Sequence, residues 1–156
     1  MAFKIKPKGL IIEPSPKKKV DNDLNCNGVY LIHNKVNNKN YVGSTTNLDR
    51  RIKNHKQHLE KGCHNNRKLQ RDYDQYGLES FEFKILERDI EEELLTAYEK
   101  YHMYMTDAIV MYKGYNEKIP TLNHKNFQKV CELKKQESNL GESNNGDQRQ
   151  NKENVN

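Results

Sequence analysis

Short apolar runs on either side of a polar turn predict a β-hairpin. Residues 28–32 form an apolar run rich in strand-forming side chains, and residues 41–43 begin a second run of the same kind. The Asn-rich stretch at residues 36–40 between them has the composition of a turn. The hairpin carries Tyr30 on one strand and Tyr41 on the other, and each tyrosine lies close to a glycine.

The pattern after the hairpin changes to helical spacing and predicts two helices. Leu48, Ile52, His55 and Leu59 recur at the spacing of one helix face, and Gly62 is placed to end that helix. A second helix is predicted to begin after a cap at Asn65 or Asn66 and to end at Gly77. Its predicted apolar face consists of Leu69, Tyr73 and Tyr76.

A third strand and a third helix complete the predicted elements. Residues 81–85 alternate strictly between apolar and polar, which indicates a half-buried strand. Asp89 stands three residues before Glu92, as in a capping box, and predicts a helix start there. The predicted apolar face of this helix consists of Leu94, Leu95, Tyr98, Tyr101, His102 and Met105. Glu99 lies at the edge of that face.

Composition divides the chain into three parts. Residues 1–27 are predicted to be a basic, flexible arm with six Lys and three acidic residues, residues 28–119 a folded domain, and residues 120–156 a polar, largely disordered tail. In the tail, residues 124–133 are predicted to form one or two amphipathic turns at most. The net charge of +5 permits nucleic-acid binding without establishing it.

Cysteine usage and hydropathy exclude several classes of protein. Cys26, Cys63 and Cys131 are odd in number and far apart, so a disulfide framework is disfavoured, and without a CxxC pair a structural zinc site is too. No apolar stretch approaches the roughly 20 residues of a membrane-spanning helix, and no signal peptide is visible. We therefore predict an intracellular protein that is neither secreted nor inserted in a membrane.

The tripeptides of the hairpin resemble the signature of the GIY-YIG nuclease family. Residues 28–30 read GVY and residues 41–43 read YVG; Arg51 with His55, then Glu99, then Gly114-Tyr115-Asn116 follow at the expected places. The resemblance covers residues 28–116. It is closest to the catalytic domains of mobile-intron and viral homing endonucleases, of which the segment LEKGCHNNRKLQRDY is typical. It implies a small α/β (α+β) fold, a three-stranded antiparallel sheet flanked by helices.

The resemblance implies a metal-dependent DNA endonuclease that hydrolyses phosphodiester bonds by in-line attack of water. Tyr30 would be the base, and because a phenol has a pKa near 10, its surroundings must perturb it. Tyr41 would hydrogen-bond the phosphate or the water, and Arg51 would hold phosphate oxygens with its charged fork. Glu99 would bind one Mg²⁺ or Mn²⁺, a hard cation that one carboxylate, waters and phosphate oxygens satisfy.

Four further residues are expected to support this cluster. His55 would hydrogen-bond it and Asn116 would position it, while Gly43 would allow the backbone and a neighbouring group to approach closely. His64 matches a position of the homing branch and would serve either in the site or only in substrate binding. These roles, like those above, are what the resemblance implies; the spacing alone shows that such a cluster is possible.

Several of these residues also have a structural interpretation. Glu99 is compatible with an incidental carboxylate at the edge of its helix face, although this interpretation is the weaker one because a partly buried charge needs a partner. Tyr30 and Tyr41 are compatible with ordinary sheet packing, and His55 with packing against Tyr41. Arg50 is a rival of Arg51, which is favoured because it lies four residues from His55, on the same side of the helix. Adjacent Cys63 and His64 are disfavoured as a metal pair, because adjacent loop residues rarely converge on one ion.

The alternative function is a nucleic-acid-binding protein that keeps the fold without turnover. Homing enzymes of this type usually carry a linker and a separate DNA-recognition domain after the catalytic domain, whereas 40 mostly polar residues follow Asn116 here. We therefore expect a truncated relative, a nuclease of low specificity, or one that depends on a partner.

Overall fold

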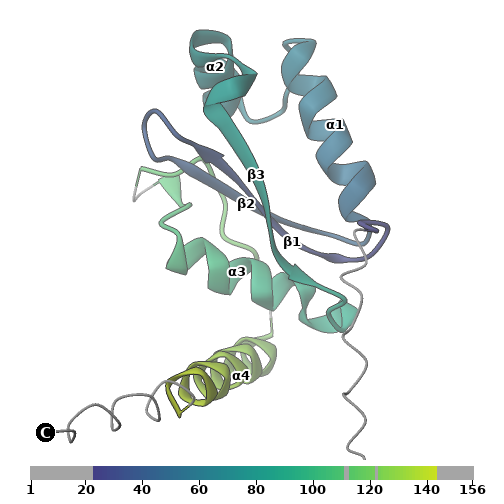
Figure 1. Cartoon of the computed structure of the whole chain (residues 1–156), viewed down its shortest axis with the longest axis vertical. Helices are drawn as coiled ribbons and strands as arrows, with labels where there is room; N and C mark the ends of the chain where they lie inside the picture. Colours follow the sequence, from purple (N-terminus) through teal and green to yellow (C-terminus); the bar gives the residue numbers. More distant parts are fainter. Residues whose placement is uncertain (1–22, 111–112, 122, 144–156) are drawn as a thin grey trace, which may run out of the picture.

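Three antiparallel strands lie at the centre of the structure: β1 (Gly28–Asn34), β2 (Asn40–Thr45) and β3 (Phe81–Arg88). The computed structural model describes residues 23–110, 113–121 and 123–143 of the chain. The strand order is β2-β1-β3, so β1 pairs with its hairpin partner on one side and with β3 on the other (Figure 1). This arrangement confirms the predicted hairpin, the third strand and the three-stranded antiparallel sheet.

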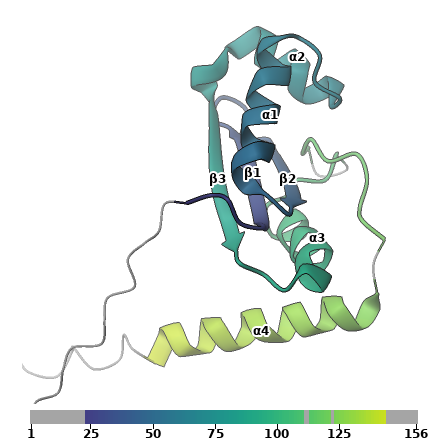
Figure 2. The same cartoon turned by 90° about the vertical axis from the view of Figure 1, so that its right-hand side faces the viewer.

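Helices cover both faces of the sheet. α1 (Leu48–Glu60) and α2 (Arg67–Tyr76) lie on one face, and α3 (Leu95–Met105) lies on the other (Figures 1 and 2). A fourth helix, α4 (His124–Ser143), packs against α3. Two short 3₁₀ turns, η1 (Leu78–Ser80) and η2 (Glu92–Leu94), precede β3 and α3.

The side chains of β1 alternate between two hydrophobic cores. Val29 and Leu31 belong to the core beneath α3, whereas Tyr30 and Ile32 belong to the core beneath α1 and α2. This alternation is the period of two expected of a strand, and it buries both faces of the central strand. Tyr30 therefore points to the α1 side of the sheet.

Local signals account for the bounds of α1 and α2. The Asn47 side chain accepts a hydrogen bond from the Arg50 N–H at the start of α1, and Gly62 follows the helix at φ +69°. The Asn66 side chain caps α2 through the Leu69 N–H, and Gly77 ends it at φ +75°. Asn66, rather than Asn65, is therefore the cap.

The predicted start of the third helix is wrong. Asp89 caps no helix; it has φ +52° and its N–H donates to the Asn27 carbonyl at 3.1 Å, so it turns the chain out of β3. The α-helix begins at Leu95, after η2. Met105 was also predicted on the apolar face but is 65% exposed, because it lies two residues, or about 200°, around the helix from the buried Met103.

Residues 124–143 belong to the tail that we predicted to be largely disordered, with one or two amphipathic turns at residues 124–133, but they form the 20-residue helix α4. Val130 of α4 is buried in the core beneath α3. Lys134 lies over the Tyr98 ring at 5.5 Å and forms an ion pair with Glu87. A few well-placed contacts thus hold a helix whose overall composition is polar. Residues 144–156 lie outside the described residues.

The end of the predicted flexible arm is also part of the domain. The Cys26 and Leu24 carbonyls accept hydrogen bonds from the Leu48 and Asp49 N–H groups, each at 2.9 Å, and so hold the arm against the start of α1. The prediction for residues 1–22 lies outside the described residues. In the part of the chain that the structure describes, no helix has the length and apolar character needed to cross a membrane.

Candidate active site

A pocket of about 400 Å³ opens between α1, α3 and the loops that flank them, and most of the predicted site residues line it. Those that do so are Tyr41, Arg51, His55, His64, Glu99 and Asn116. Tyr30 lies behind this surface, in contact with Tyr41 and His55, and Gly43 lies against the Tyr30 ring. Residues from β2, α1, α3 and two loops, separated by up to 75 positions in the chain, thus meet at one site.

Strand register brings the tyrosines to this site. Tyr30 on β1 lies opposite Gly43 on β2, and the Tyr30 ring occupies the space that a side chain at position 43 would need. A Cβ at Gly43 would overlap the Tyr30 hydroxyl, which is the physical reason for glycine at this position. The Tyr30 and Tyr41 rings are 6.4 Å apart, and Tyr30 is only 1% exposed.

One turn of α1 places Arg51 and His55 beside the tyrosines. His55 Nε2 lies 2.7 Å from the Tyr30 hydroxyl oxygen, and the Arg51 Nε–H donates to the same oxygen at 3.1 Å. The His55 ring also lies 5.5 Å from the Tyr41 ring, edge to face. The predicted shared side of Arg51 and His55 is therefore the side that faces the hairpin.

His64 lies behind His55 and extends the same set of contacts. The Nδ1 atom of His55 is 2.7 Å from the Nε2 atom of His64. The Asn66 N–H donates to His64 Nδ1 at 3.0 Å, and the His64 N–H donates to the Gln70 side chain at 2.9 Å. Both histidines are buried, at 4% and 6% exposed.

Burial is the largest cause of the shifted pKa values of the histidines and tyrosines in this site. It lowers the pKa of His55 to about 3, assisted by the positive charge of Arg51, and it also lowers the pKa of His64. Burial raises the pKa of Tyr30 and of Tyr41, and Arg51 partly offsets the rise in each case. Near neutral pH both histidines are therefore uncharged and both phenols are protonated in the protein without ligands.

Glu99 reaches the pocket from α3, on the opposite face of the sheet. The Ser44 hydroxyl of β2 donates to Glu99 Oε2 at 2.5 Å. Burial raises the pKa of Glu99, and the Ser44 hydrogen bond and the Arg51 charge only partly offset this rise. In the described ranges there is no cluster of three or more His, Cys, Asp or Glu that could hold a metal ion. Glu99 is thus a partly desolvated carboxylate that a cation would stabilise.

Asn116 fixes the far wall of the pocket. Its Oδ1 accepts the Val42 N–H and its Nδ2 donates to the Val42 carbonyl, both at 2.8 Å. The side chain thereby pairs with β2 as a neighbouring strand would. It holds residues 115–117 against the strand that carries Tyr41 and Gly43.

A second hollow, of about 430 Å³, adjoins the pocket and shares Arg51 and Asn54 with it. Ser44, Thr45, Thr46 and Arg50 complete its lining. Arg50 lines this second hollow only, whereas Arg51 lines both.

Comparison with known proteins identifies the family. A family model described as the GIY-YIG catalytic domain matches residues 26–116, which is more than half of the chain. The chain belongs to the GIY-YIG family. This confirms the membership that the resemblance of the hairpin tripeptides implied.

Relatives of this GIY-YIG chain include phage intron enzymes. Intron-associated endonuclease 1 of Enterobacteria phage T4 is 40% identical over 90 residues, which cover 57% of this chain and 36% of that protein. The solved catalytic domain of homing endonuclease I-TevI is 38% identical, with a TM-score of 0.53, covering 59% of this chain and 98% of the other. A mutant of that domain gives 37% identity and a TM-score of 0.55, covering 62% and 98%.

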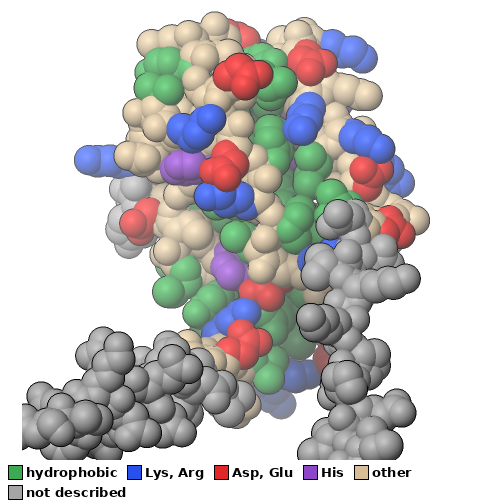
Figure 3. Space-filling model, in the orientation of Figure 1, with side chains coloured by type: hydrophobic (Ala, Val, Ile, Leu, Met, Phe, Trp, Pro, Cys, Tyr) green, Lys and Arg blue, Asp and Glu red, His purple; other side chains and the backbone are tan. Residues whose placement is uncertain are grey.

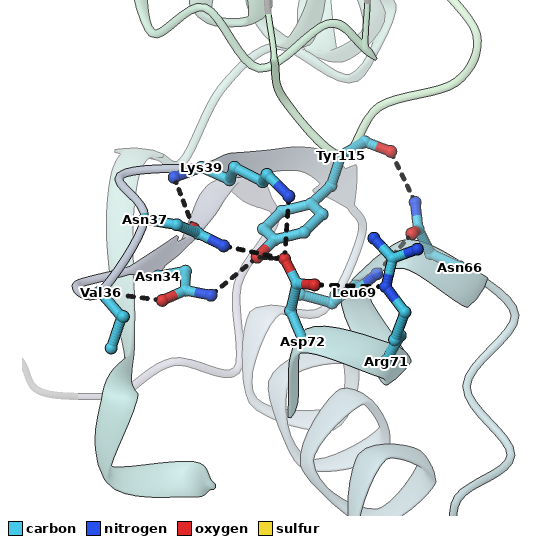
Figure 4. Close-up of polar contacts among 9 residues, drawn as sticks. All are labelled: Asn34, Val36, Asn37, Lys39, Asn66, Leu69, Arg71, Asp72 and Tyr115. Carbon is cyan, nitrogen blue, oxygen red and sulfur yellow. Dashed lines mark hydrogen bonds and ion pairs between the residues drawn. The ribbon is translucent and has the colours of Figure 1, made fainter. Parts of the chain in front are cut away.

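The structure also contains a buried polar cluster that the sequence analysis missed. Asp72 on α2 is 3% exposed and accepts hydrogen bonds from the Tyr115 hydroxyl at 2.9 Å and from Lys39 at 3.1 Å (Figure 4). Burial opposes its ionisation, but hydrogen bonds from Lys39, Tyr115 and Asn37 outweigh this and lower the pKa of Asp72. The cluster ties α2 to the hairpin turn and to the loop that carries Asn116.

The buried face of α2 differs from the predicted one for this reason. Leu69 is buried as expected, but the other buried residues are Gln70 and Asp72, while Tyr73 and Tyr76 are only half-buried. A buried polar face of this kind breaks the apolar periodicity on which the prediction rested. No pattern in the sequence marked Gln70 or Asp72 as buried.

Proposed function

We propose that the chain is a metal-dependent DNA endonuclease that hydrolyses phosphodiester bonds by in-line attack of water. The observation that supports this most directly is the convergence of Tyr30, Tyr41, Arg51, His55 and Glu99 at one pocket. The chain belongs to a family whose matched relatives are named endonucleases. Because it spans only 36% of the curated relative's length, the activity of the whole relative comes to this chain as a proposal.

Arg51 is the group proposed to bind the scissile phosphate. Its Nε is committed to Tyr30, but a guanidinium carries five N–H donors in a planar fork. Arg51 is exposed and lines the pocket, so it can hold phosphate oxygens with its terminal nitrogens while Nε orients the phenol. Binding and orientation are thus joined in one side chain.

Tyr30 is proposed as the base and Tyr41 as the group that contacts the phosphate or the attacking water. Burial raises the pKa of Tyr30, so the role requires positive charge near its oxygen. Arg51 supplies part of this positive charge, and its hydrogen bond offsets part of the rise in the pKa of Tyr30. Tyr41 lines the pocket whereas Tyr30 lies behind it, so Tyr41 meets the substrate first.

Glu99 is proposed to hold one Mg²⁺ or Mn²⁺. Nucleases of this family generally use divalent metal ions. Glu99 suits Mg²⁺ as a ligand, because this ion keeps several waters and takes one or two carboxylates plus substrate phosphates. When bound, the ion would supply positive charge that stabilises the developing charge on the leaving 3′ oxygen. Ser44 would hold the Glu99 carboxylate in place through its hydroxyl.

The proposed path of DNA follows the pocket and the adjoining hollow. On the face in Figure 3, basic and acidic side chains are interspersed, so that face lacks the uniform basic surface typical of a DNA-binding face. The two hollows instead offer Arg50 and Arg51 side by side, with the hydroxyls of residues 44–46 beside them. A strand whose scissile phosphate lies at Arg51 would place a neighbouring phosphate near Arg50.

The proposal is tested by incubating the full-length protein with supercoiled plasmid and, separately, with high-molecular-weight DNA of diverse sequence. We expect nicked or linear products with Mg²⁺ or Mn²⁺ and none in excess chelator. Binding of both DNAs without any strand break, under either metal, would contradict the proposal and support the non-catalytic alternative. Denaturing gels that resolve single-strand breaks keep rare nicking visible.

Arg51→Ala is expected to lower the single-turnover cleavage rate on the order of 10²–10³, the scale of losing one donor to the transition state. Arg50→Ala is the matched control, because it removes the same charge from the adjacent position but lies outside the pocket. It should weaken DNA binding and its salt dependence with little effect on the rate at saturation. A larger loss of rate for Arg50→Ala would show that the assignment of these two arginines is reversed.

A further inference from the structure

A continuous series of hydrogen bonds runs from the start of α2 to the proposed base. It joins the Asn66 N–H to His64 Nδ1 at 3.0 Å, His64 Nε2 to His55 Nδ1 at 2.7 Å, and His55 Nε2 to the Tyr30 oxygen at 2.7 Å. We call this series the Asn66–His64–His55–Tyr30 relay. Every ring nitrogen of both histidines takes part in it.

The direction of the relay follows from its first member. A backbone N–H only donates, so His64 Nδ1 must accept and carries no proton. A neutral imidazole has one N–H, which places the His64 proton on Nε2 and makes it the donor to His55 Nδ1. The same reasoning then places the His55 proton on Nε2, where it is donated to Tyr30.

Two observations support neutral histidines in the relay. Both rings are more than nine-tenths buried, and burial lowers the pKa of each. A proton added to His64 Nδ1 would also face the Asn66 N–H, a donor that the charged form could not accept. The Asn66 N–H thus disfavours the charged form of His64, and burial disfavours the charged form of both rings.

We propose that His64 is a positioning residue that locks the tautomer of His55, so that His55 donates a hydrogen bond to Tyr30 and cannot accept its proton. This rests on the proposed function, in which Tyr30 acts in the reaction. The Tyr30 oxygen then accepts two hydrogen bonds, one from His55 Nε2 and one from Arg51 Nε. Two donors on one phenol oxygen favour its negative form and fix the direction of its own O–H.

A histidine in the position of His55 can either accept the proton of Tyr30 or donate a hydrogen bond to its oxygen. A histidine beside a tyrosine can remove the phenol proton if its facing nitrogen is free. Here the facing nitrogen already carries the proton that the relay directs to it. The Tyr30 proton must therefore leave toward a group other than His55, and His55 stabilises the oxygen by donating to it.

A buried scaffold holds the first member of the relay in place. The Asn66 side chain caps α2 through the Leu69 N–H at 2.9 Å and donates to the Tyr115 carbonyl at 2.6 Å. The Tyr115 hydroxyl donates in turn to Asp72, as Figure 4 shows. The Gln70 side chain, which also belongs to α2, accepts a hydrogen bond from the His64 N–H. The polar cluster on α2 thus acts on the site by fixing the Asn66 amide and His64.

The direct test reads the tautomers by long-range ¹H–¹⁵N correlation spectra of the full chain labelled at histidine, near pH 7 and without DNA or metal. We expect both His55 and His64 as neutral rings with the proton on Nε2. A His55 ring protonated at Nδ1, or an imidazolium at either position, would overturn the proposal. This readout needs no activity, so its failure is distinct from failure of the proposed function.

Two substitutions at His64 link the tautomer to the rate. His64→Leu removes the donor to His55, so we expect the Nδ1–H tautomer of His55 to appear. The cleavage rate at saturating DNA and metal should fall about 10–100-fold, which is the scale for losing a hydrogen-bond partner that orients a metal-binding side chain. His64→Gln keeps an N–H donor at a similar distance, so it should keep most of the Nε2–H tautomer of His55 and most of the cleavage rate. Equal loss of rate in the two variants with an unchanged His55 tautomer would overturn the proposal.

His58→Leu is the matched control, because His58 is exposed and lines the same pocket outside the relay. It should leave the His55 tautomer unchanged, whatever its effect on DNA binding in the pocket. If His64→Leu fails to fold, the wild-type tautomers and the comparison of His64→Gln with His58→Leu remain decisive. A shift of the His55 tautomer in His58→Leu would contradict the relay as the cause.

Discussion

Replacing Glu99 with Gln is expected to abolish cleavage while leaving the fold intact. Glu99 is the proposed metal ligand, and removing its charge removes the attraction for the cation. A bound metal contributes several kcal/mol of charge stabilisation, which corresponds to a loss of roughly 10³-fold or more in rate. The Gln oxygen can still accept the Ser44 hydroxyl, and burial already disfavours the charged carboxylate. Folding stability should therefore be unchanged or slightly higher.

The measurement combines plasmid cleavage with Mn²⁺ binding by calorimetry and thermal unfolding. Glu117→Gln is the matched control, since Glu117 is an exposed carboxylate that lines the same pocket. It should retain metal binding and most of the activity, and both variants should bind DNA in the absence of metal nearly as the wild type does. Wild-type cleavage in excess chelator, or full activity in the Glu99 variant, would sink the metal assignment.

Local chemistry made the hairpin and the first two helices predictable. Asn47, Gly62, Asn66 and Gly77 are caps or stops whose effect depends on neighbours within a few residues, so the sequence marks them directly. The continuous apolar run of β1 was also predictable as a strand, and it is apolar throughout because each face of the strand is buried in its own core. The same logic failed at Asp89, where the Asn27 carbonyl, 62 residues earlier, accepts its N–H and turns the chain.

Tertiary contacts explain what the sequence could not reveal. Helix α4 depends on Val130 and Lys134 meeting α3 and β3, and its composition alone predicted disorder. Asp72 reads as a solvent-facing charge on α2 until Tyr115, 43 residues later, is seen to donate to it. A buried carboxylate is tolerated only when such partners are present, and partners distant in sequence leave no local pattern.

The candidate site could be located from the sequence but its internal order could not. The resemblance to the family pointed to six of the residues that line the pocket, because the strand pair and one turn of α1 bring several of them together. His64 and the backbone N–H of Asn66 decide which ring nitrogens donate and which accept. A backbone N–H cannot be recognised in a sequence motif. The burial of Tyr30 behind Tyr41 was likewise invisible in the two tripeptides.

Tyr30→Phe is expected to lower the cleavage rate by roughly 10²–10⁴, the range for loss of a general base. The substitution removes one oxygen and keeps the ring that fills the space over Gly43, so the packing of the hairpin should survive. It also leaves the His55 Nε2–H and one Arg51 donor without their acceptor. An unpaired buried donor costs about 1–3 kcal/mol, so a modest loss of stability should accompany the loss of rate.

Stability and chemistry must therefore be measured separately. Single-turnover rates are compared at saturating metal and at a temperature where both proteins are fully folded, as judged by chemical denaturation. Tyr41→Phe is the matched control, because it removes the same hydroxyl from the paired ring, which faces the pocket. It should impair the rate less, through loss of a contact with the phosphate or the water.

The order of the two variants decides the assignment of the base. If Tyr41→Phe is the more damaging, the Tyr41 phenol, which lines the pocket, is the base and Tyr30 serves to position it. Near-wild-type cleavage by Tyr30→Phe would return Tyr30 to the role of a core residue, since its ring lies among Ile32, Leu48 and Tyr115 in the core beneath α1 and α2. We expect a large loss of cleavage rate in Tyr30→Phe and a smaller one in Tyr41→Phe. This result would mean that the phenol that loses its proton is Tyr30, which lies behind the residues that line the pocket. The two donors on the Tyr30 oxygen make that position suited to negative charge.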